Sequence, residues 1–363
     1  MNVKKSQKLP FKTSDYEDQT KTKHKVFKDY IDRWIKIVGK YNRLNYIDGF
    51  GGIGAYIDSR GKIHYGSPIL AAKAIDENTS KLRRTVNLLV IDEDNNNLEN
   101  IRKIFEHEKI AIKPTLIHGD FDKTINDILD NVKNLAPTFL FVDPFGFKIK
   151  MQTIERVMKI DKTEILLNFM FTRVNQFLSD PKKTNIYNDL FGNIYWQNCT
   201  KLHGEEREKC IIEGYRKWLK QFTRHVYYFR LEYPDKRRTY YYLFHLTNHF
   251  LGCSIIKSSF AKFNYGRVEY RGRRGSQLEL FNNKDIIIKN VTNYLREVYK
   301  GQQKSFQEII EEQIDETEFL ESHMREAVKK MESNEVIINR IPPTTTLGKK
   351  RVGLEYKDII IFR

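Results

Sequence analysis

The most constraining feature of the chain is a regular alternation of apolar and amphipathic segments between residues 44 and 169. Each apolar segment is short enough for a buried strand and is followed by residues with helical spacing. The predicted strands cover residues 44–48, 86–91, 111–117, 137–142 and 163–169. Since parallel strands need crossover helices and bury both faces, we expect an α/β fold with a mostly parallel Rossmann-like sheet and helices on both faces.

The regions before and after these strands define the expected domain limits. Residues 1–23 are polar and lysine-rich, and we expect them to form a disordered basic arm. Residues 24–40 have the apolar spacing of a helix that ends at a glycine. We therefore expect one Rossmann-like domain over residues 24–300.

The second half of the chain contains three further predicted regions. Residues 175–222 have a helical pattern and are expected to form an insertion. Residues 223–232 and 238–246 alternate and are rich in aromatic residues, which predicts an antiparallel strand pair at the edge of the sheet. Residues 301–363 combine amphipathic helices with a final hairpin pattern, which predicts a winged-helix-like domain.

The charge of the chain favours an anionic partner. The chain has 63 Lys and Arg against 47 Asp and Glu, a net charge of +16. Nucleic acid is the first candidate for such a partner. The three cysteines (Cys199, Cys210 and Cys253) are scattered, so we expect no disulfide scaffold, no zinc site and a reducing cytoplasmic location. No apolar run is long enough for a membrane span.

A glycine cluster follows the first predicted strand. In residues 46–54 (YIDGFGGIG) an aspartate leaves the strand and meets four glycines, which permit sharp turns and close approach of a ligand to the backbone. The spacing fails the dinucleotide-binding pattern and is similar to the first motif of S-adenosylmethionine (SAM) methyltransferases. A simple turn is the alternative. The candidate cofactor-binding residues here are Asp48, Gly49, Phe50, Gly51, Gly52, Gly54 and, at the start of the next helix, Ser67.

Acidic residues also follow the next three strands. Asp92 is the candidate ligand of the ribose hydroxyls, and Asp120 with Phe121 is the candidate contact for the adenine ring. Helix capping is the alternative for both aspartates. The substrate-facing candidates, which would carry catalysis, are Asp143, Pro144 and Phe145, with a proline turn as the alternative. Because all these residues end consecutive strands, they are expected to share one edge of the sheet.

Three stretches together resemble the three-Cys-motif partner protein family. They are residues 46–56 (YIDGFGGIGAY), 66–70 (GSPIL) and 141–147 (FVDPFGF), and residues 167–178 and 240–246 also fit. The resemblance covers about residues 24–363. It implies a class I methyltransferase fold with a C-terminal winged-helix-like region, and a three-Cys-motif protein as a partner. The cysteines of the family name belong to that partner and not to this chain.

The glycine loop is also similar to that of ribosomal RNA adenine-N6 methyltransferases, which carry Asp-Pro-Pro-Tyr after the fourth strand. This chain has Asp143-Pro144-Phe145-Gly146 instead. The resemblance implies that Asp143 accepts a proton of the target amine, while stacking on a base would come from Phe145 or Phe147. The departure weakens the case for adenine-N6 chemistry more than the case for cofactor binding.

Basic residues suited to phosphate contacts lie in two regions. Between residues 215 and 275 arginines are interleaved with aromatic residues, and a lysine pair lies in the predicted wing. Solvated surface charge is the alternative. The candidate nucleic-acid-binding residues are Arg237, Arg238, Arg271, Arg273, Arg274, Lys349, Lys350 and Arg351. The histidines are too far apart in sequence to predict a metal site.

These patterns together favour a cytoplasmic SAM-dependent methyltransferase-like protein that acts on or with nucleic acid. Two alternatives come from other classes. One is a non-catalytic module that binds nucleic acid or a partner protein on a methyltransferase scaffold. The other is a metal-dependent nuclease of a defence cassette.

Overall fold

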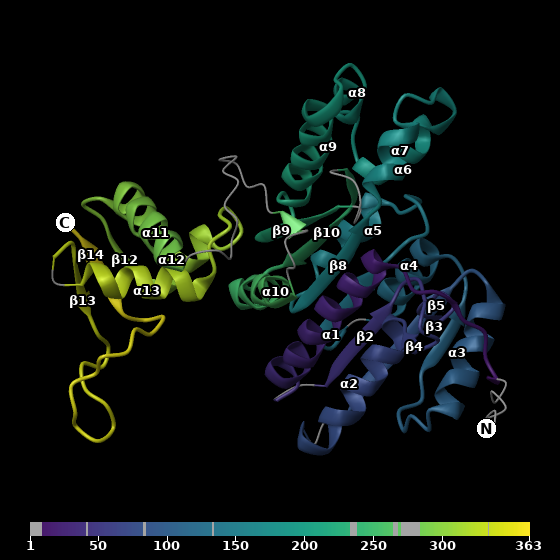
Figure 1. Ribbon diagram of the computed structural model, residues 1–363, viewed down its shortest axis with the longest axis horizontal. Helices are drawn as coiled ribbons and strands as arrows, with labels where there is room; N and C mark the ends of the chain where they lie inside the picture. Colours follow the sequence, from purple (N-terminus) through teal and green to yellow (C-terminus); the bar gives the residue numbers. More distant parts are fainter. Residues whose placement is uncertain are drawn as a thin grey trace. The chain divides into compact units, whose positions relative to one another are not determined.

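The computed structural model of the chain contains two compact units, Met1–Val268 and Glu269–Arg363. The residues that the structure describes are 9–40, 43–82, 85–132, 134–232, 238–263, 268–269, 284–332 and 334–363. The division falls earlier than the expected boundary at residue 300, because a helix before that residue packs inside the second unit. Figure 1 labels helices and strands of both units.

The first unit is built around a sheet of order β11-β9-β10-β8-β7-β2-β5-β6, whose strands lie within the unit except for β11, which ends one residue past its limit. The strands are β2 (Leu44–Asp48), β5 (Val86–Asp92), β6 (Thr115–His118), β7 (Thr138–Val142), β8 (Thr163–Phe169), β9 (His225–Glu232), β10 (Thr239–Thr247) and β11 (Val268–Glu269). The five strands predicted from apolar runs pair in parallel, which confirms the mostly parallel Rossmann-like sheet. β10 runs antiparallel to both β8 and β9, as the aromatic alternation predicts.

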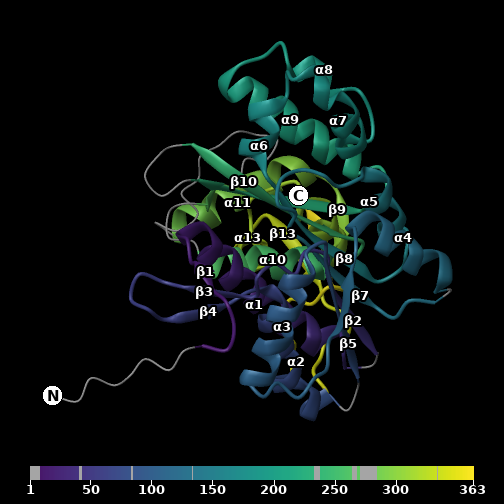
Figure 2. The same cartoon turned by 90° about the vertical axis from the view of Figure 1, so that its right-hand side faces the viewer.

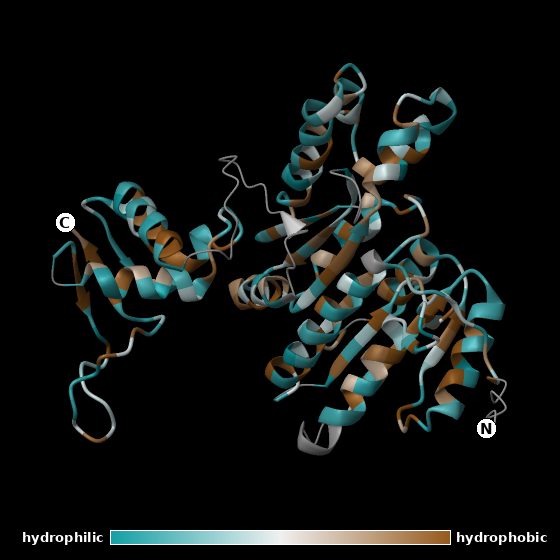
Figure 3. Ribbon diagram, in the orientation of Figure 1, coloured by the Kyte–Doolittle hydropathy of each residue, from teal (hydrophilic) through white to brown (hydrophobic). Residues whose placement is uncertain are grey.

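Helices cover both faces of this sheet, and strand and helix residues share a buried apolar core. In Figure 3, which colours the ribbon by hydropathy, brown stretches occur on both the strands and the helices. One face carries α1 (Asp18–Val38), α2 (Ser67–Leu82), α3 (Asn95–His107) and α10 (Phe250–Phe263). The other carries α4 (Phe121–Asn131), α5 (Met151–Met158), α6 (Phe171–Phe177), α7 (Thr184–Phe191) and α9 (Gly204–Leu219). The apolar stripe of α1 explains its position, since Phe27, Tyr30 and Trp34 are all buried.

The expected disorder of residues 1–23 is wrong for the part that the structure describes. β1 (Ser14–Asp15) pairs with β3 (Ala55–Ile57), and α1 begins at Asp18 rather than at residue 24. β3 also pairs with β4 (Ile63–Tyr65) and completes a small sheet, which lies outside the central sheet in Figure 2. Pairing with the strand that follows the glycine loop therefore orders a segment whose composition predicts disorder.

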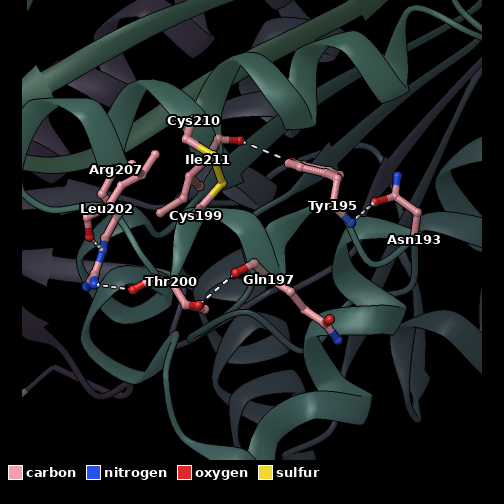
Figure 4. Close-up of a disulfide and its surroundings, with 9 residues drawn as sticks. All are labelled: Asn193, Tyr195, Gln197, Cys199, Thr200, Leu202, Arg207, Cys210 and Ile211. Carbon is pink, nitrogen blue, oxygen red and sulfur yellow. Dashed lines mark hydrogen bonds between the residues drawn. A yellow bond between two sulfur atoms is a disulfide. The ribbon is translucent and has the colours of Figure 1, made fainter.

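The region expected as a helical insertion is helical, and it contains one disulfide, which the scattered cysteines did not lead us to expect. Besides α6, α7 and α9 it holds a short 3₁₀ helix (Pro181–Lys183) and α8 (Trp196–Cys199). α8 and α9 lie next to each other, so that Cys199 and Cys210 form a disulfide across them (Figure 4). Cysteine scatter along the sequence was a poor guide because a turn between two helices brings the pair together. The cysteines therefore no longer support a reducing cytoplasmic location.

The second unit has the order of elements expected of a winged helix. It comprises α11 (Lys284–Tyr299), β12 (Gln303–Ser305), α12 (Phe306–Gln313), α13 (Glu321–Met331), β13 (Val336–Asn339) and β14 (Ile359–Phe362). The strands form one antiparallel sheet of order β12-β14-β13. α11 packs on α13, which explains why the unit begins before residue 301. Between β13 and β14 the residues from 341 to 350 are exposed and form the wing.

Candidate active site at the carboxyl edge of the sheet

Three aspartates lie at the carboxyl ends of strands around the point where the strand order reverses. β2 is flanked by β5 on one side and by β7 on the other, and the chain visits β5 and β6 before it returns to β7. In open α/β sheets ligands bind at this switch point. Asp48 ends β2, Asp92 ends β5, and Asp143 follows β7. The fold therefore brings together three of the predicted site residues.

The glycine loop is pinned to its two neighbouring strands. The Gly49 amide donates to the carbonyl of Phe141 at 2.8 Å, and the Gly51 amide donates to that of Ile91 at 2.9 Å. A Cβ at Gly51 would lie 2.5 Å from Cγ1 of Val90, so only glycine fits there. Gly52 has a φ of +58°, with open space where a Cβ would be. The loop thus runs close to the sheet edge and presents its backbone outward at Gly52.

Asp92 holds this loop in place. Its Oδ2 accepts a hydrogen bond from the Gly52 amide at 2.7 Å. Its Oδ1 accepts from the Asp94 amide at 2.8 Å and from the Asn97 side chain at 3.1 Å. A carboxylate has about four lone-pair sites, so one on Oδ2 is left for a ligand hydroxyl. Asp94, and not Asp92, caps α3 by accepting from the Asn96 amide.

Asp48 is a fully buried carboxyl group. Burial is the main influence and raises its pKa to about 7, although Ser67, the Tyr46 hydroxyl and the Phe50 amide all donate to it and act in the opposite direction. The Tyr46 hydroxyl lies 2.7 Å from Oδ2, and the Phe50 amide lies 3.3 Å from Oδ1. Ser67 is thus placed at the site by its bond to Asp48, as expected for the start of α2.

The raised pKa of Asp48 predicts a specific pH dependence of folding stability. The unfolded carboxyl has a pKa near ~3.9, so the folded state holds its proton more tightly and stability falls as pH rises towards 7. Asp48→Asn removes this titration. From pH 5 to pH 8 the free energy of unfolding of the variant should rise by about 3 kcal/mol relative to that of the natural chain, as measured by urea unfolding. If the difference in unfolding free energy between the two proteins stays the same across this range, the raised pKa of Asp48 is contradicted.

Asp120 and Phe121 lie at the start of α4. Asp120 is exposed and caps the helix, since its Oδ1 accepts from the Lys123 amide at 2.8 Å. Phe121 is only 3% exposed and stacks on Phe50, with ring centroids 5.1 Å apart. Phe121 also leaves no room for a side chain at Gly49, because a Cβ there would lie 2.7 Å from its ring. Phe121 therefore acts as a core side chain that supports the loop, and Phe50 is the more accessible ring.

Asp143 has two partners of its own. The ammonium of Lys23 donates to Oδ2, and the Asn168 side chain donates to Oδ1 at 2.6 Å. Pro144 is buried, whereas Phe145 is fully exposed beside it. Phe147, the other candidate for stacking, packs on buried Tyr187 with ring centroids 5.2 Å apart. Phe145 is thus the aromatic residue of this motif that is available to a ligand.

The predicted nucleic-acid contacts meet different outcomes. Arg238 is exposed at the start of β10, and Lys349 and Lys350 are exposed in the wing. The prediction for Arg351 is wrong, because it is buried and paired with the buried carboxylate of Asp358. The remaining predicted contacts lie outside the described residues: Arg237, Arg271, Arg273 and Arg274.

Sequence reasoning missed two residues of the site, Lys23 and Asn168. Asn168 could have been singled out from the sequence, because it is the amide side chain in the apolar strand 163–169 and lies near the carboxyl end of that strand. Lys23 had none, since it is one of many lysines near the N-terminus and its partner is 120 residues away. Tertiary pairing of this kind cannot be recognised from local composition.

The described ranges of the chain, 9–40, 43–82, 85–132, 134–232, 238–263, 268–269, 284–332 and 334–363, contain neither a metal-binding cluster nor a membrane-spanning helix. Within them no cluster of three or more His, Cys, Asp or Glu residues is arranged to hold a metal ion. In the same ranges no helix combines the length and apolar character needed to cross a membrane.

Comparison with known proteins identifies the second unit. Residues 273–344 match the family described as GMT-like wHTH domain. No curated protein sequence matches the chain. Among solved structures, a DUF519-family protein from Legionella pneumophila is 14% identical, covers 70% of this chain and 98% of its own, and has a TM-score of 0.45. An O-methyltransferase from Bacillus cereus in complex with SAH is 13% identical, covers 66% and 84%, and has a TM-score of 0.36.

The strand order and the domain match together define the class of the protein. It has an α/β Rossmann-like fold of the methyltransferase type, with a mostly parallel central sheet and a C-terminal winged helix-turn-helix domain.

Proposed function

We propose that the chain binds SAM at the carboxyl edge of its sheet and is a methyltransferase that acts on nucleic acid. The observation that carries the proposal is the convergence of Asp48, Asp92 and Asp143 on one switch point, with the glycine loop between them. A loop pinned so closely to the strands serves a ligand that must approach the backbone.

The residues present fit this cofactor. The remaining lone pair on Asp92 suits a ribose hydroxyl, and the buried Asp48 would support the loop from below through its bonds to Ser67, Tyr46 and Phe50. Phe50 offers a partly exposed ring near the adenine position, and Asp120 lies at the adjoining strand end. SAM supplies an electrophilic methyl group, so the protein's contribution is mainly to position the two reactants.

The substrate side of the site is formed by the residues after β7. Asp143 would accept a hydrogen bond from the amine to be methylated, and the carbonyl of Pro144 would accept a second. Phe145 is fully exposed and would stack on the target base. This arrangement orients an exocyclic amine without the tyrosine of the Asp-Pro-Pro-Tyr pattern.

The winged helix supports nucleic acid as the partner, although its net charge is small. Residues 269–363 contain 17 Lys and Arg against 16 Asp and Glu, so nearly all of the +16 charge lies in residues 1–268. Electrostatic attraction would therefore come mainly from the first unit. In the second unit contact would depend on a few exposed lysines, with Lys349 and Lys350 in the wing and Lys329 and Lys330 on α13.

Removal of the two wing lysines should therefore weaken nucleic-acid binding without affecting the fold. The double variant Lys349→Ala, Lys350→Ala is expected to lower affinity roughly tenfold and to reduce the salt slope of log K by about 2. Fluorescence anisotropy with a labelled duplex at several salt concentrations measures both. The control is Lys357→Ala, an exposed lysine beyond the wing. An unchanged slope would exclude the wing from the interface.

Transfer of a labelled methyl group from SAM tests the enzymatic part of the proposal. Purified protein would be incubated with mixed RNA and DNA, and the nucleic acid counted. Asp143→Asn should lower turnover more than a hundredfold and leave the affinity for S-adenosylhomocysteine (SAH) within about threefold. If the variant transfers methyl groups as fast as the natural chain, Asp143 has no role in the reaction.

A second candidate function is a non-catalytic module on the same scaffold. The ion pair between Lys23 and Asp143 favours it, because the carboxylate that would receive a substrate amine is already paired. This candidate predicts nucleic-acid binding that Asp143→Asn leaves unchanged and no methyl transfer by any form of the protein.

A further inference from the structure

The carboxylate of Asp143 already holds an amine, and that amine belongs to the same chain. The Lys23 ammonium donates to Oδ2 while Asn168 occupies Oδ1, so both oxygens are engaged. The side chain of Lys23 is only 10% exposed and that of Asp143 is 22% exposed. A lysine buried to this extent is rare unless it is paired. The pair is therefore a formed feature of the site and not a surface contact.

An aromatic ring completes the surroundings of this ammonium. The Nζ of Lys23 lies 5.7 Å from the centroid of the Tyr241 ring, which is buried on β10. Asp143, Asn168 and Tyr241 come from three neighbouring strand regions, and we call them the acceptor subsite. A carboxylate, a fixed amide and a ring face recognise an amine, either an alkylammonium or the exocyclic amine of a base.

The segment that carries Lys23 lies before the buried apolar stripe of α1. The N-cap residue Glu17 makes no side-chain capping bond, and the buried apolar stripe of the helix begins only at Val26. Contacts of this segment include the short β1–β3 pairing, the ring of Tyr16, which stacks on His64 at 4.3 Å, and the buried ring of His24, which lies beside Tyr16. Local opening of these turns should cost less than release of the helix body.

We propose that Lys23 is a built-in occupant of the acceptor subsite, which the exocyclic amine of a nucleobase must displace. The proposal rests on the proposed function, because it takes this subsite as the place of the target amine. Only molecules in which the subsite is open can accept the substrate amine. The apparent affinity for the substrate is therefore the intrinsic affinity multiplied by the open fraction. Since β1 pairs with the strand after the glycine loop, the segment that opens is also connected to the cofactor loop.

Binding of two oligonucleotides tests the proposal, with and without SAH. The probes are fluorescent single-stranded 12-mers of deoxyadenylate, which has an exocyclic amine, and of thymidylate, which has none. Lys23→Met should bind the adenylate probe at least tenfold more tightly than the natural chain and the thymidylate probe no more tightly. Loss of a positive charge would by itself weaken both. Lys28→Met, an exposed position on the same helix, should change neither.

Equal or weaker binding of adenylate by Lys23→Met, or a gain shared by both probes, would overturn the proposal. Lys23→Gln is the second variant if the first fails to fold, as judged by circular dichroism. If the natural chain does not bind SAH, the proposed function fails, while the comparison of probes without SAH still decides the role of Lys23.

Chemical labelling of the natural chain gives a test that needs no variant. Lys23 should react with an acetylating reagent at least tenfold more slowly than Lys28 in the free protein, because it is buried. Saturation with the adenylate probe should increase the rate at Lys23 and leave Lys28 unchanged, as measured by peptide mass spectrometry. A Lys23 that remains protected under saturation would overturn the proposal.

Discussion

Gly51→Val is expected to abolish SAH binding and to destabilise the first unit by about 3 kcal/mol. A Cβ at this position lies 2.5 Å from Cγ1 of Val90 and 3.0 Å from Cδ1 of Ile101, both of which are buried. Neither neighbour is a flexible surface chain, so the glycine loop itself must move. That movement breaks the bond from the Gly51 amide to Ile91 and displaces Gly52 from Asp92. Calorimetry and urea unfolding measure the two effects.

The matched control for this variant is Gly353→Ala. That glycine has open space around a built Cβ and no positive φ. We expect a stability change within about 0.5 kcal/mol and unchanged SAH binding. A Gly51→Val protein that binds SAH as well as the natural chain would show that the loop does not contact the cofactor.

Asp358→Ala is expected to destabilise the second unit by about 3 kcal/mol. Asp358 is fully buried, and its carboxylate accepts hydrogen bonds from the Ile341 amide at 2.9 Å and the Glu355 amide at 2.8 Å as well as from Arg351. The substitution leaves Arg351 buried without its main partner and frees both ends of the wing. Hydrogen exchange in residues 284–363 should rise, while exchange in the central sheet should stay unchanged.

The pH dependence of the second unit provides a further sign of the same interaction. Burial alone would raise the pKa of Asp358, but Arg351 and the two amides hold it below its usual value. A lowered pKa contributes stability above the unfolded value near ~3.9 and loses it as pH falls through the folded value. The natural unit should therefore lose this contribution below about pH 4, and Asp358→Ala should not. Lys357→Ala, its exposed neighbour, is the control.

The parts of the fold that depend on local pattern could be predicted from the sequence. The five parallel strands follow from apolar runs, and the shared edge of Asp48, Asp92 and Asp143 follows from their positions after those strands. The capping alternative was right for Asp120 and wrong for Asp92, since its neighbour Asp94 is the cap; an acidic residue before a helix is a local signal. The winged helix followed from the order of its elements.

The parts that depend on distant pairing could not be predicted. Lys23 looked like one lysine of a disordered arm because nothing near it in sequence indicates Asp143. Arg351 looked like part of a basic run because its partner Asp358 lies beyond a turn. Cys199 and Cys210 are brought together by the packing of two helices. In each case the residue looks ordinary in the sequence, and only the fold shows which partner it contacts.

Titration of the purified full chain with SAH by calorimetry tests the central claim most directly. The account predicts binding in the micromolar range, which Asp92→Ala weakens at least a hundredfold because it removes both the ribose ligand and the anchor of Gly52. Asp94→Ala removes only a helix cap and should bind SAH nearly as well as the natural chain. Absence of SAH binding by a natural chain shown to be folded would contradict the cofactor site and leave the non-catalytic module as the better description.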